Sequence, residues 1–402
     1  MSHLQRFQQL GALLSEEAHF WRPVPFKGEP RQWQHPALHD ALQALSDEQV
    51  DLLQGCDQQL QDFFSPFLPF TAELQHLCAL ERHQLPLHSA VTALHGDAAG
   101  ASRWHVGVPG RKADQIRAFG TALGDAGQQV VEWCGGKGHL GRYLHACYGS
   151  RVDTLEIDST LVREGEELAR KLDYPQSLHE CDVLAEPSAV WLKPETHLLG
   201  LHACGGLHVT MLEKGVDAGT CRISLSPCCY HLYGPEQYQP MSGSGRVTGL
   251  HLTREELRNA VRQTETAPAR QRRQRAQMQS WRLGFDALQQ QITGTGQYMP
   301  VPSLPTRLLK GSFEAFCRHC AELKGLSLAE NLDFFRFERE GLALFRQRSR
   351  EDLVRMLFRR PLEVWLALDR VLFLEENGYQ CRLLQFCPPA LTPRNLLLDA
   401  HR

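Results

Sequence analysis

Long apolar runs are missing from this chain of 402 residues. No stretch of 18 apolar residues occurs, and the first twenty residues hold no apolar run of signal-peptide length, which argues against a transmembrane helix and a secretory leader. Excess charge is missing too: the formal net charge is −3, so no global positive field attracts nucleic acid. We therefore expect a cytoplasmic protein without membrane contacts, in which any polyanion contact comes from a local patch.

The chain contains 42% hydrophobic and 22% charged residues, a balance that is ordinary for a globular protein with large cores. Its length predicts two or three structural units. The 13 cysteines lie in and beside apolar segments, which in a reducing compartment is typical of buried thiols. Cys317 and Cys320 form a single C-x-x-C with no second pair at zinc-finger spacing, so we expect no bound metal.

The stretch VVEWCGGKGHLG at 130–141 predicts a buried strand, a tight turn and a helix. Glycines in the turn permit positive φ angles and let a ligand approach the backbone. A dinucleotide-binding turn would place its first glycine where Cys134 stands, and Glu132 at the end of the strand would repel a pyrophosphate. An acidic group there can instead hold an ammonium group, which favours S-adenosylmethionine. A glycine-rich turn alone also occurs in unrelated α/β proteins.

Acidic residues end the next two predicted strands. Glu156 and Asp158 close the strand at 152–157, about twenty residues beyond the glycine turn, where an acidic side chain meets a ribose diol. Glu156 is the better candidate, because Asp158 also fits as the N-cap of the following helix. Asp182 closes a third strand at 179–184, where it could accept a hydrogen bond from an adenine amino group or cap the next turn.

Two further strands are expected at 196–202 and 221–226, so five strands separated by helices deliver polar residues to one sheet edge. This pattern predicts an α/β fold with a doubly wound, Rossmann-like parallel sheet, and runs at 380–386 and 395–398 indicate a closing antiparallel pair. We expect four segments: a helical N-terminal cap at 1–105, a core with strands one to five at 106–250, a helical insertion at 251–375, and closing strands six and seven at 376–402.

Positive charge is concentrated near the start of one predicted helix at 269–282. A charge run of this kind is usually a solvated helix face. It is also the local candidate for contact with a polyanion such as RNA. Its arginines include Arg270, Arg272, Arg273 and Arg275.

Together these features resemble the Rossmann-like class I S-adenosylmethionine-dependent methyltransferases. More narrowly, LHACGGL at 201–207 and CCYH at 228–231 are similar to the branch of methyltransferase-like and rRNA-adenine-dimethylase-domain-containing proteins. LDRVLFLEENGY at 368–379 and TPRN at 392–395 fit the same branch. A group of tRNA 2′-O-methyltransferases with a CC-His-His variant is related to it.

The resemblance implies S-adenosylmethionine as the cofactor and suggests which residues bind it. Cys134 stands where many members place glycine, and its small side chain leaves the turn intact. His202, Cys204 and Gly205 would flank the methyl group. The cofactor would be held by Glu132, Gly136 and Gly138 around Cys134 at the methionine end, by Glu156 at the ribose and by Asp182 at the adenine.

Methyl transfer from a sulfonium mainly requires alignment of the acceptor and exclusion of water. His231 and His202 are candidate bases for a nitrogen or oxygen acceptor, and Tyr230 could stack on a displaced base. Cys204 is a candidate partner for the cysteines at 228–229 in a thiolate attack on a pyrimidine ring. Zinc binding by these cysteines with His231, and burial as small hydrophobic side chains, are the alternatives.

We therefore expect an S-adenosylmethionine-dependent methyltransferase that acts on structured RNA, either rRNA or tRNA. A protein side chain is the alternative acceptor, because a helical insertion covers a peptide as readily as an RNA stem and the net charge does not favour RNA. A third hypothesis is an inactive methyltransferase-fold module that only binds partners.

Overall fold

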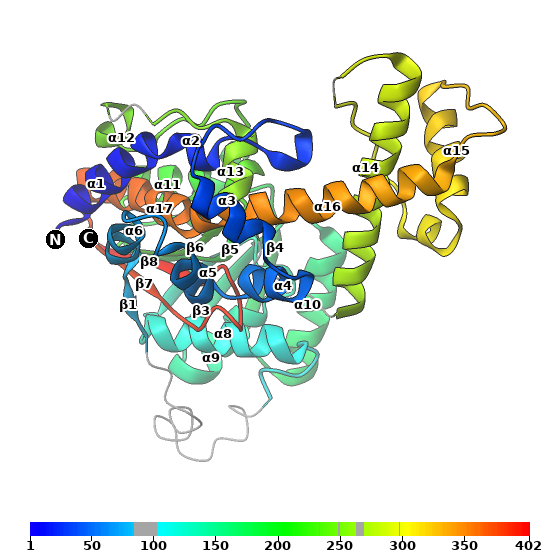
Figure 1. Ribbon diagram of the computed structural model, residues 1–402. Helices are drawn as coiled ribbons and strands as arrows, with labels where there is room; N and C mark the ends of the chain where they lie inside the picture. Colours follow the sequence, from blue (N-terminus) through cyan, green and yellow to red (C-terminus); the bar gives the residue numbers. More distant parts are fainter. Residues whose placement is uncertain (84–102, 233, 248–249, 263–268, 297) are drawn as a thin grey trace. The chain divides into compact units, whose positions relative to one another are not determined.

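The computed structural model describes residues 1–83, 103–232, 234–247, 250–262, 269–296 and 298–402 (Figure 1). Packing of the Cα trace divides the chain into two units, each discontinuous in sequence. None of the helices in the described ranges combines the length and the apolar composition that crossing a bilayer requires. Unit 1 comprises Met1–Ser15, Leu74–Arg262 and Arg359–Arg402, and unit 2 comprises Glu16–Glu73 and Gln263–Phe358.

Unit 1 contains an eight-stranded sheet. Its strands are β1 (Glu81–Arg82), β2 (Gln129–Trp133), β3 (Arg151–Glu156), β4 (Gln176–Glu180), β5 (His197–Cys204), β6 (Arg222–Cys228), β7 (Gln380–Gln385) and β8 (Leu396–His401). In space they follow the order β1-β7-β8-β6-β5-β2-β3-β4. β8 runs antiparallel to β6 and β7, whereas the other neighbouring pairs are parallel. The expected doubly wound α/β fold with an antiparallel final strand is confirmed.

The start of α10 (Ser159–Leu172) in unit 1 follows directly from the local sequence. Asp158 caps α10: its Oδ1 accepts hydrogen bonds from the backbone N–H groups of Thr160 and Leu161 at 2.8 and 3.3 Å, as expected for an N-cap. The other helices are α1 (His3–Glu16), α6 (Thr71–Cys78), α8 (Gly110–Leu123), α9 (His139–Tyr148), η2 (Glu186–Trp191), α11 (Gly206–Asp217), η3 (Tyr230–Leu232), α12 (Gly243–Val247), α13 (Arg254–Ala260) and α17 (Arg359–Glu376).

These helices pack against the sheet in two groups. α8 and α9 bury Phe119 and Leu144 in one apolar cluster with Val130 of β2. α11 contacts β5 and β6, and α17 contacts β7 and β8. α17 is buried along most of its length, and its Trp365 stacks on Phe7 of α1 with the ring centroids 4.8 Å apart. The sheet thus lies at the centre of unit 1, and its carboxyl edge is left to loops.

Unit 2 consists of helices and loops. α14 (Ala269–Thr293) packs along α16 (Phe334–Leu357), and Trp281 belongs to an apolar cluster between the helices of this unit. Cys317 and Cys320 are fully buried in that cluster, which agrees with a role as small hydrophobic side chains. The remaining helices of unit 2 are α2 (Ala18–Trp21), η1 (Pro25–Lys27), α3 (Pro36–Gln43), α4 (Asp47–Gly55), α5 (Asp57–Phe64), η4 (Thr306–Lys310) and α15 (Phe313–Lys324).

The observed units differ from the expected segment boundaries. The insertion expected at 251–375 is divided, because Gln263–Phe358 lies in unit 2 whereas α13 and α17 lie with the sheet in unit 1. The cap expected at 1–105 is divided as well, and 84–102 lies outside the described residues. Helical periodicity identified the helices but not their partners, because an apolar stripe does not specify which surface it covers.

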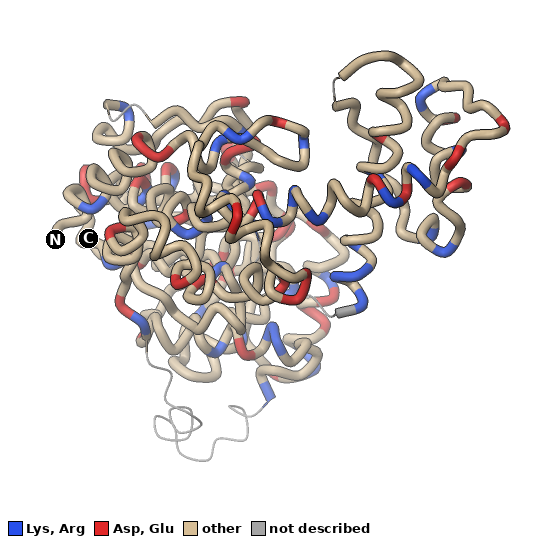
Figure 2. Tube along the Cα trace, in the orientation of Figure 1, with Lys and Arg blue, Asp and Glu red and all other residues tan. Residues whose placement is uncertain are grey.

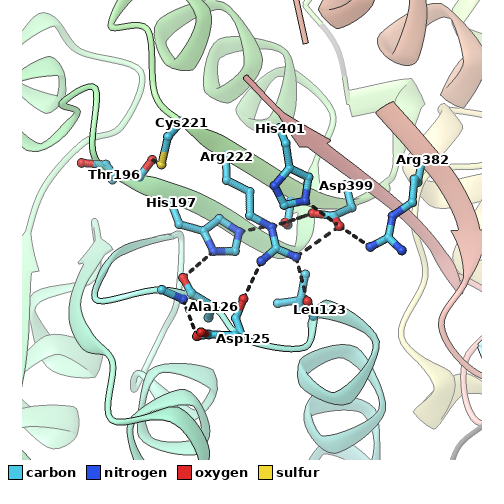
Figure 3. A network of polar contacts seen from close by, with 12 residues as sticks. Leu123, Asp125, Ala126, Thr196, His197, Cys221, Arg222, Arg382, Asp399 and His401 are labelled. Atoms are coloured by element: carbon cyan, nitrogen blue, oxygen red, sulfur yellow. Dashed lines mark hydrogen bonds and ion pairs between the residues drawn. The ribbon is translucent and has the colours of Figure 1, made fainter. Parts of the chain in front are cut away.

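A buried polar network joins the start of β6 to the end of β8 (Figure 3). Asp399 is fully buried, and its carboxylate accepts hydrogen bonds from Arg222 Nε at 2.9 Å and from Ser224 Oγ at 2.7 Å. Arg222 also donates to the backbone carbonyls of Leu123 and Asp125. The network lies at the amino end of β6. It therefore links β6 to β8 and leaves the carboxyl end of β6 free.

Acid is expected to destabilise unit 1 through buried histidines such as His208. Its Nδ1–H donates to the Ala203 carbonyl and its Nε2 accepts from Arg370. Burial, with a smaller contribution from Arg370, lowers the pKa of His208 to about 3, whereas an unfolded histidine titrates near ~6.5. Between these values only the unfolded chain binds the proton. The contribution of His208 to the free energy of unfolding is therefore fully present above the unfolded pKa. It falls as the pH drops below that value, by up to about 1.4 kcal/mol per pH unit.

Urea unfolding between about pH 7 and pH 5 measures this slope. His208→Gln keeps one donor and one acceptor but cannot titrate, so it is expected to make the slope shallower than in the wild type. Identical slopes for the two proteins would contradict the assignment of a neutral, buried His208.

Candidate active site

The loop between β2 and α9 has the geometry of a ligand cradle. Gly136 and Gly138 have φ angles of 60° and 66°, and Cys134 adopts the left-handed region as well, at 55°. A Cβ at Gly136 would meet no described atom within 4 Å, so the backbone there is open to a ligand. Gly138 faces Gln176 instead, whose Nε2 donates to the Gly138 carbonyl at 2.8 Å.

Glu132 lies beneath this loop. It is 4% exposed, and its Oε2 accepts hydrogen bonds from Thr154 Oγ1 at 2.8 Å and from the Gly141 N–H at 3.3 Å. Burial raises the pKa of Glu132 to about 7. The adjoining cavity, lined by Gly135 and His139 among others, encloses about 30 Å³, which is room for about one water molecule. Glu132 lines this cavity and accepts from the first turn of α9, and its expected contact with the methionine end stays a prediction.

Glu156 ends β3 and turns its carboxylate toward the glycine loop. Its Oε2 accepts from the Gly136 N–H at 2.9 Å, and its Oε1 accepts from the N–H groups of Ile157 and Asp158 at 2.9 and 3.1 Å. Asp158 is occupied in capping α10. The carboxylate that the spacing selected therefore lies beside the glycine loop, and its contact with a ribose stays a prediction. A partly buried carboxylate next to an open backbone can bind ribose hydroxyls.

Asp182 is exposed in the loop after β4. The strand was expected at 179–184, but β4 ends at Glu180, so Asp182 lies beyond the strand. Its Oδ1 accepts from the Leu184 N–H at 3.0 Å, which is the turn-capping role considered from the sequence. Val183 is buried although it belongs to a loop, and its apolar side chain made the strand look longer.

Lys214 of α11 holds this loop, and the sequence did not reveal it. Its ammonium group donates to the carbonyls of Val183 and Ala185 at 3.2 and 2.5 Å and to Ser188 Oγ at 2.7 Å. Charge-assisted hydrogen bonds to three acceptors fix the loop after β4 relative to α11. No local pattern marks a lysine in an amphipathic helix for such a role, because the fold supplies its partners.

Cys134 lies among the predicted cofactor residues. Burial raises the pKa of Cys134 to about 12, with further contributions from Glu156, Cys204 and Asp182. These interactions place the ends of β2, β3 and β5 and the loop after β4 within electrostatic reach of one another. The structure thus brings the predicted residues to one sheet edge, and Cys134 stays a protonated thiol near neutral pH.

The turns after β5 and β6 form the other half of this edge. Cys204 and Cys228 are partners in the parallel register, and their Sγ atoms are 3.3 Å apart. Gly205 has a φ of 53°, and a Cβ there would lie 2.5 Å from the carbonyl carbon of Leu232. The turn after β5 therefore packs directly on η3, which only glycine permits.

The thiols of Cys204, Cys228 and Cys229 lie within 4.8 Å of one another. Hydrogen bonds from Cys204 and Cys228, aided by Arg394 and His231, lower the pKa of Cys229, whereas the same thiol contacts raise the pKa of Cys228. One thiolate stabilised by two thiols accounts for both directions. The cation near this group, Arg394, comes from the loop between β7 and β8. Sequence reasoning missed it because it lies far along the chain.

His202 and His231 are candidate bases that are neutral in this structure. Burial lowers the pKa of His202 to about 4, with contributions from Lys112 and Arg394, and burial also lowers the pKa of His231. The Nδ1 atom of each ring is buried and has no hydrogen-bond partner within the described ranges. A neutral imidazole can accept a proton, so both residues stay candidate bases and their role stays a prediction.

Tyr230 does not have the predicted role in base stacking. It is 1% exposed, and its ring packs edge-on against His208 with the centroids 5.5 Å apart. The guanidinium of Arg370 lies 5.1 Å from the centroid of the same ring. A displaced base cannot reach a side chain enclosed in this way, so Tyr230 belongs to the core beneath the edge.

Comparison with known proteins gives a match over part of the chain. Residues 112–235 match a family model described as a methyltransferase domain. This match supports the expected methyltransferase domain within unit 1. The match includes no residue of unit 2 and does not reach 368–379 or 392–395. The narrower branch suggested by LHACGGL and CCYH therefore stays a prediction.

Several solved structures are similar to parts of the chain. A geranyl diphosphate methyltransferase in complex with SAM is 17% identical, with a TM-score of 0.26, over 37% of this chain and 62% of that one. The geranyl diphosphate C-methyltransferase of Streptomyces coelicolor A3(2) is 15% identical, with a TM-score of 0.27, over 40% and 64%. A cyclopropane synthase from Mycobacterium tuberculosis is 13% identical, with a TM-score of 0.26, over 79% and 99%. The chain thus spans less than two thirds of either geranyl diphosphate enzyme.

Proposed function

We propose that this protein transfers the methyl group of S-adenosylmethionine to an acceptor in structured RNA. The observation that carries the cofactor assignment is the open backbone at Gly136 beside the Glu156 carboxylate. Both lie where parallel strands end, and open α/β sheets bind ligands outside the carboxyl ends of their strands.

The residues of this edge fit the cofactor. Gly136 leaves room for close approach, Glu156 can accept hydrogen bonds from a ribose diol, and the exposed Asp182 can accept one from an adenine amino group. When bound, S-adenosylmethionine supplies an electrophilic methyl group. Cys134 does not compete for it, because a protonated thiol is a poor nucleophile. His202 and His231 would accept the proton that a nitrogen or oxygen acceptor loses.

Support for an RNA acceptor comes from the start of α14 in unit 2. Blue segments gather there in Figure 2, and Arg270, Arg273 and Arg275 are exposed whereas Arg272 is partly buried. Guanidinium groups clustered on one helix end suit contacts with phosphate oxygens. Trp281 takes no part as a stacking surface, because it is 5% exposed and its indole N–H donates to Glu338 at 3.0 Å.

Replacing both Arg270 and Arg273 with alanine is expected to reduce the salt dependence of RNA binding. If each arginine contacts one phosphate, the slope of log K against log salt falls by about 2 in magnitude. Arg346→Ala is the matched control in the same unit, because Arg346 pairs with Asp47 at 2.8 Å and is not part of the patch. Equal slopes for the wild type and the double variant would show that this patch does not bind RNA.

The class of acceptor is tested with methyl-labelled S-adenosylmethionine and a lysate from cells that lack the protein. We expect label in the RNA fraction. Label in the protein fraction would overturn the RNA proposal and favour a protein side chain. Absence of label in both fractions, together with no saturable binding of S-adenosylmethionine in calorimetry, would identify an inactive binding module.

A further inference from the structure

One group of side chains in the described part of the chain has metal-ligand spacing. The Sγ atoms of Cys204, Cys228 and Cys229 all lie within 4.8 Å of one another, and those of Cys204 and Cys228 are 3.3 Å apart. In a tetrahedral zinc site with Zn–S distances of about 2.3 Å, neighbouring thiolates lie about 3.8 Å apart. Small side-chain movements would therefore bring the cluster to ligating geometry.

The backbone is bent in a way that makes the thiols converge. Consecutive residues of a strand point to opposite faces, so Cys228 and Cys229 would normally diverge. Cys229 has a left-handed φ of 47°, which turns its side chain back toward the other two. On the neighbouring strand, His202 has a φ of 66°, and the register shifts between Leu201 and Ala203 before Cys204 pairs with Cys228.

Such conformations of non-glycine residues cost about 1–3 kcal/mol each and persist where the surroundings determine them. Two of them flank one cluster of thiols here. In a regular strand, adjacent cysteines point to opposite faces and cannot easily bind one ion. The left-handed backbone at Cys229 removes that objection.

Some residues within electrostatic reach of Cys229 carry buried polar atoms without partners. Arg394 Nη1, His202 Nδ1 and His231 Nδ1 are buried and lack a hydrogen-bond partner among the residues that the structure describes. Arg394 and His231 are close enough to Cys229 to interact with it electrostatically. Three thiolates around a divalent cation carry one net negative charge, which the Arg394 guanidinium would offset. Buried polar atoms are rarely left unpaired, and water or thiolate ligands of an ion would satisfy them.

We propose that Cys204, Cys228 and Cys229 form a three-thiolate site for a soft divalent cation, Zn²⁺. Cys228 is buried, whereas Cys204 and Cys229 are partly exposed, so an ion can enter from the sheet edge. Three protein ligands leave the fourth tetrahedral position to water or to an acceptor atom, as in open zinc sites. The site does not depend on the proposed methyl transfer, and the proposal departs from the expectation that the chain binds no metal.

The test uses the full chain, purified under reducing conditions, loaded with zinc and freed of excess ion by gel filtration. Elemental analysis is expected to find about one zinc per chain, and replacement by Co²⁺ is expected to give thiolate-to-cobalt charge-transfer absorption. Loss of an outer partner of a metal site lowers affinity about 10–100-fold, so loss of a ligand in Cys204→Ser or Cys229→Ser is expected to lower it by more than about 100-fold. Circular dichroism checks that each variant folds.

Cys221→Ser is the matched control, because Cys221 is exposed and precedes the other end of β6. It is expected to bind zinc like the wild type. Wild-type protein without zinc and without charge-transfer absorption would overturn the proposal. A zinc content that survives both Cys204→Ser and Cys229→Ser would place the ion elsewhere, and a Cys204–Cys228 disulfide found by mass spectrometry in the reduced protein would also contradict it. Metal content is measured without S-adenosylmethionine, so failure here is distinct from failure of the methyltransferase assignment.

Discussion

Replacing Gly136 with alanine is expected to weaken binding of S-adenosylmethionine on the order of 100-fold, a change of about 2.7 kcal/mol. The added methyl group meets no described atom within 4 Å, so the folded chain can accommodate it. It would occupy the space from which a ligand approaches the loop. The remaining cost is the left-handed φ of 60°, which is about 1–2 kcal/mol for a residue with a Cβ.

Gly149→Ala is a matched control for this experiment. Gly149 is the C-cap of α9, the helix that follows the glycine loop, and it has a φ of 70°. A Cβ at Gly149 would likewise meet no described atom within 4 Å, so both variants are expected to lose similar stability in urea unfolding. Only Gly136→Ala is expected to lose affinity in calorimetric titration. Equal affinities of the two variants for S-adenosylmethionine would mean that the ligand does not approach Gly136.

Replacing Asp399 with alanine is expected to lower the free energy of unfolding by about 3–5 kcal/mol. Its fully buried carboxylate accepts from Arg222, Ser224 and Arg382, at 2.9, 2.7 and 2.7 Å. Removal would leave the Arg222 guanidinium, whose side chain is 11% exposed, without its counter-charge. Since domains are stable by about 5–15 kcal/mol in total, this change removes a large part of the stability.

The pKa of Asp399 supports the same expectation. Burial alone would raise it, but hydrogen bonds and charges from Arg222 and Arg382, with Ser224, outweigh burial and hold the pKa well below its ordinary value. A carboxyl group whose pKa is depressed in the folded state stabilises the fold at pH values above the unfolded pKa of about 3.9. This stabilisation is lost as the pH falls below that value. The stabilisation is therefore fully present at neutral pH.

Arg382→Ala separates the loss of the buried charge from the loss of a surface ion pair. Arg382 contacts the same carboxylate, but its side chain is 57% exposed, so its removal is expected to cost less than about 1 kcal/mol. Urea midpoints of the three proteins provide the comparison. A midpoint for Asp399→Ala equal to that of Arg382→Ala would show that the network does not hold β6 to β8.

The fold was largely predictable because local chemistry marks its strands and turns. The valines of β2, the glycines after it and the acidic residue that ends β3 each predict a strand, a turn or a strand end without knowledge of distant residues. The composition of the two units was not predictable in this way. α17 is buried along most of its length and packs against β7 and β8, whereas its periodicity alone fitted an insertion equally well.

The site was predictable only where a residue follows directly from a strand end. Glu156 was found by its spacing from the glycine loop, and Asp182 was placed near the correct edge although β4 ends earlier. Contacts made by distant segments could not be found, such as Lys214 on the loop after β4 and Arg394 beside Cys229. Tyr230 was misassigned because its burial depends on Arg370 and His208, which lie on other elements.

A crystal structure of the full chain with S-adenosylhomocysteine tests the central claim most directly. The account predicts density for the nucleoside across the Gly136 backbone, with the ribose hydroxyls on the Glu156 carboxylate and the adenine beside Asp182. Density for the ligand away from the carboxyl ends of β2 and β3, with the glycine loop empty, would contradict the account.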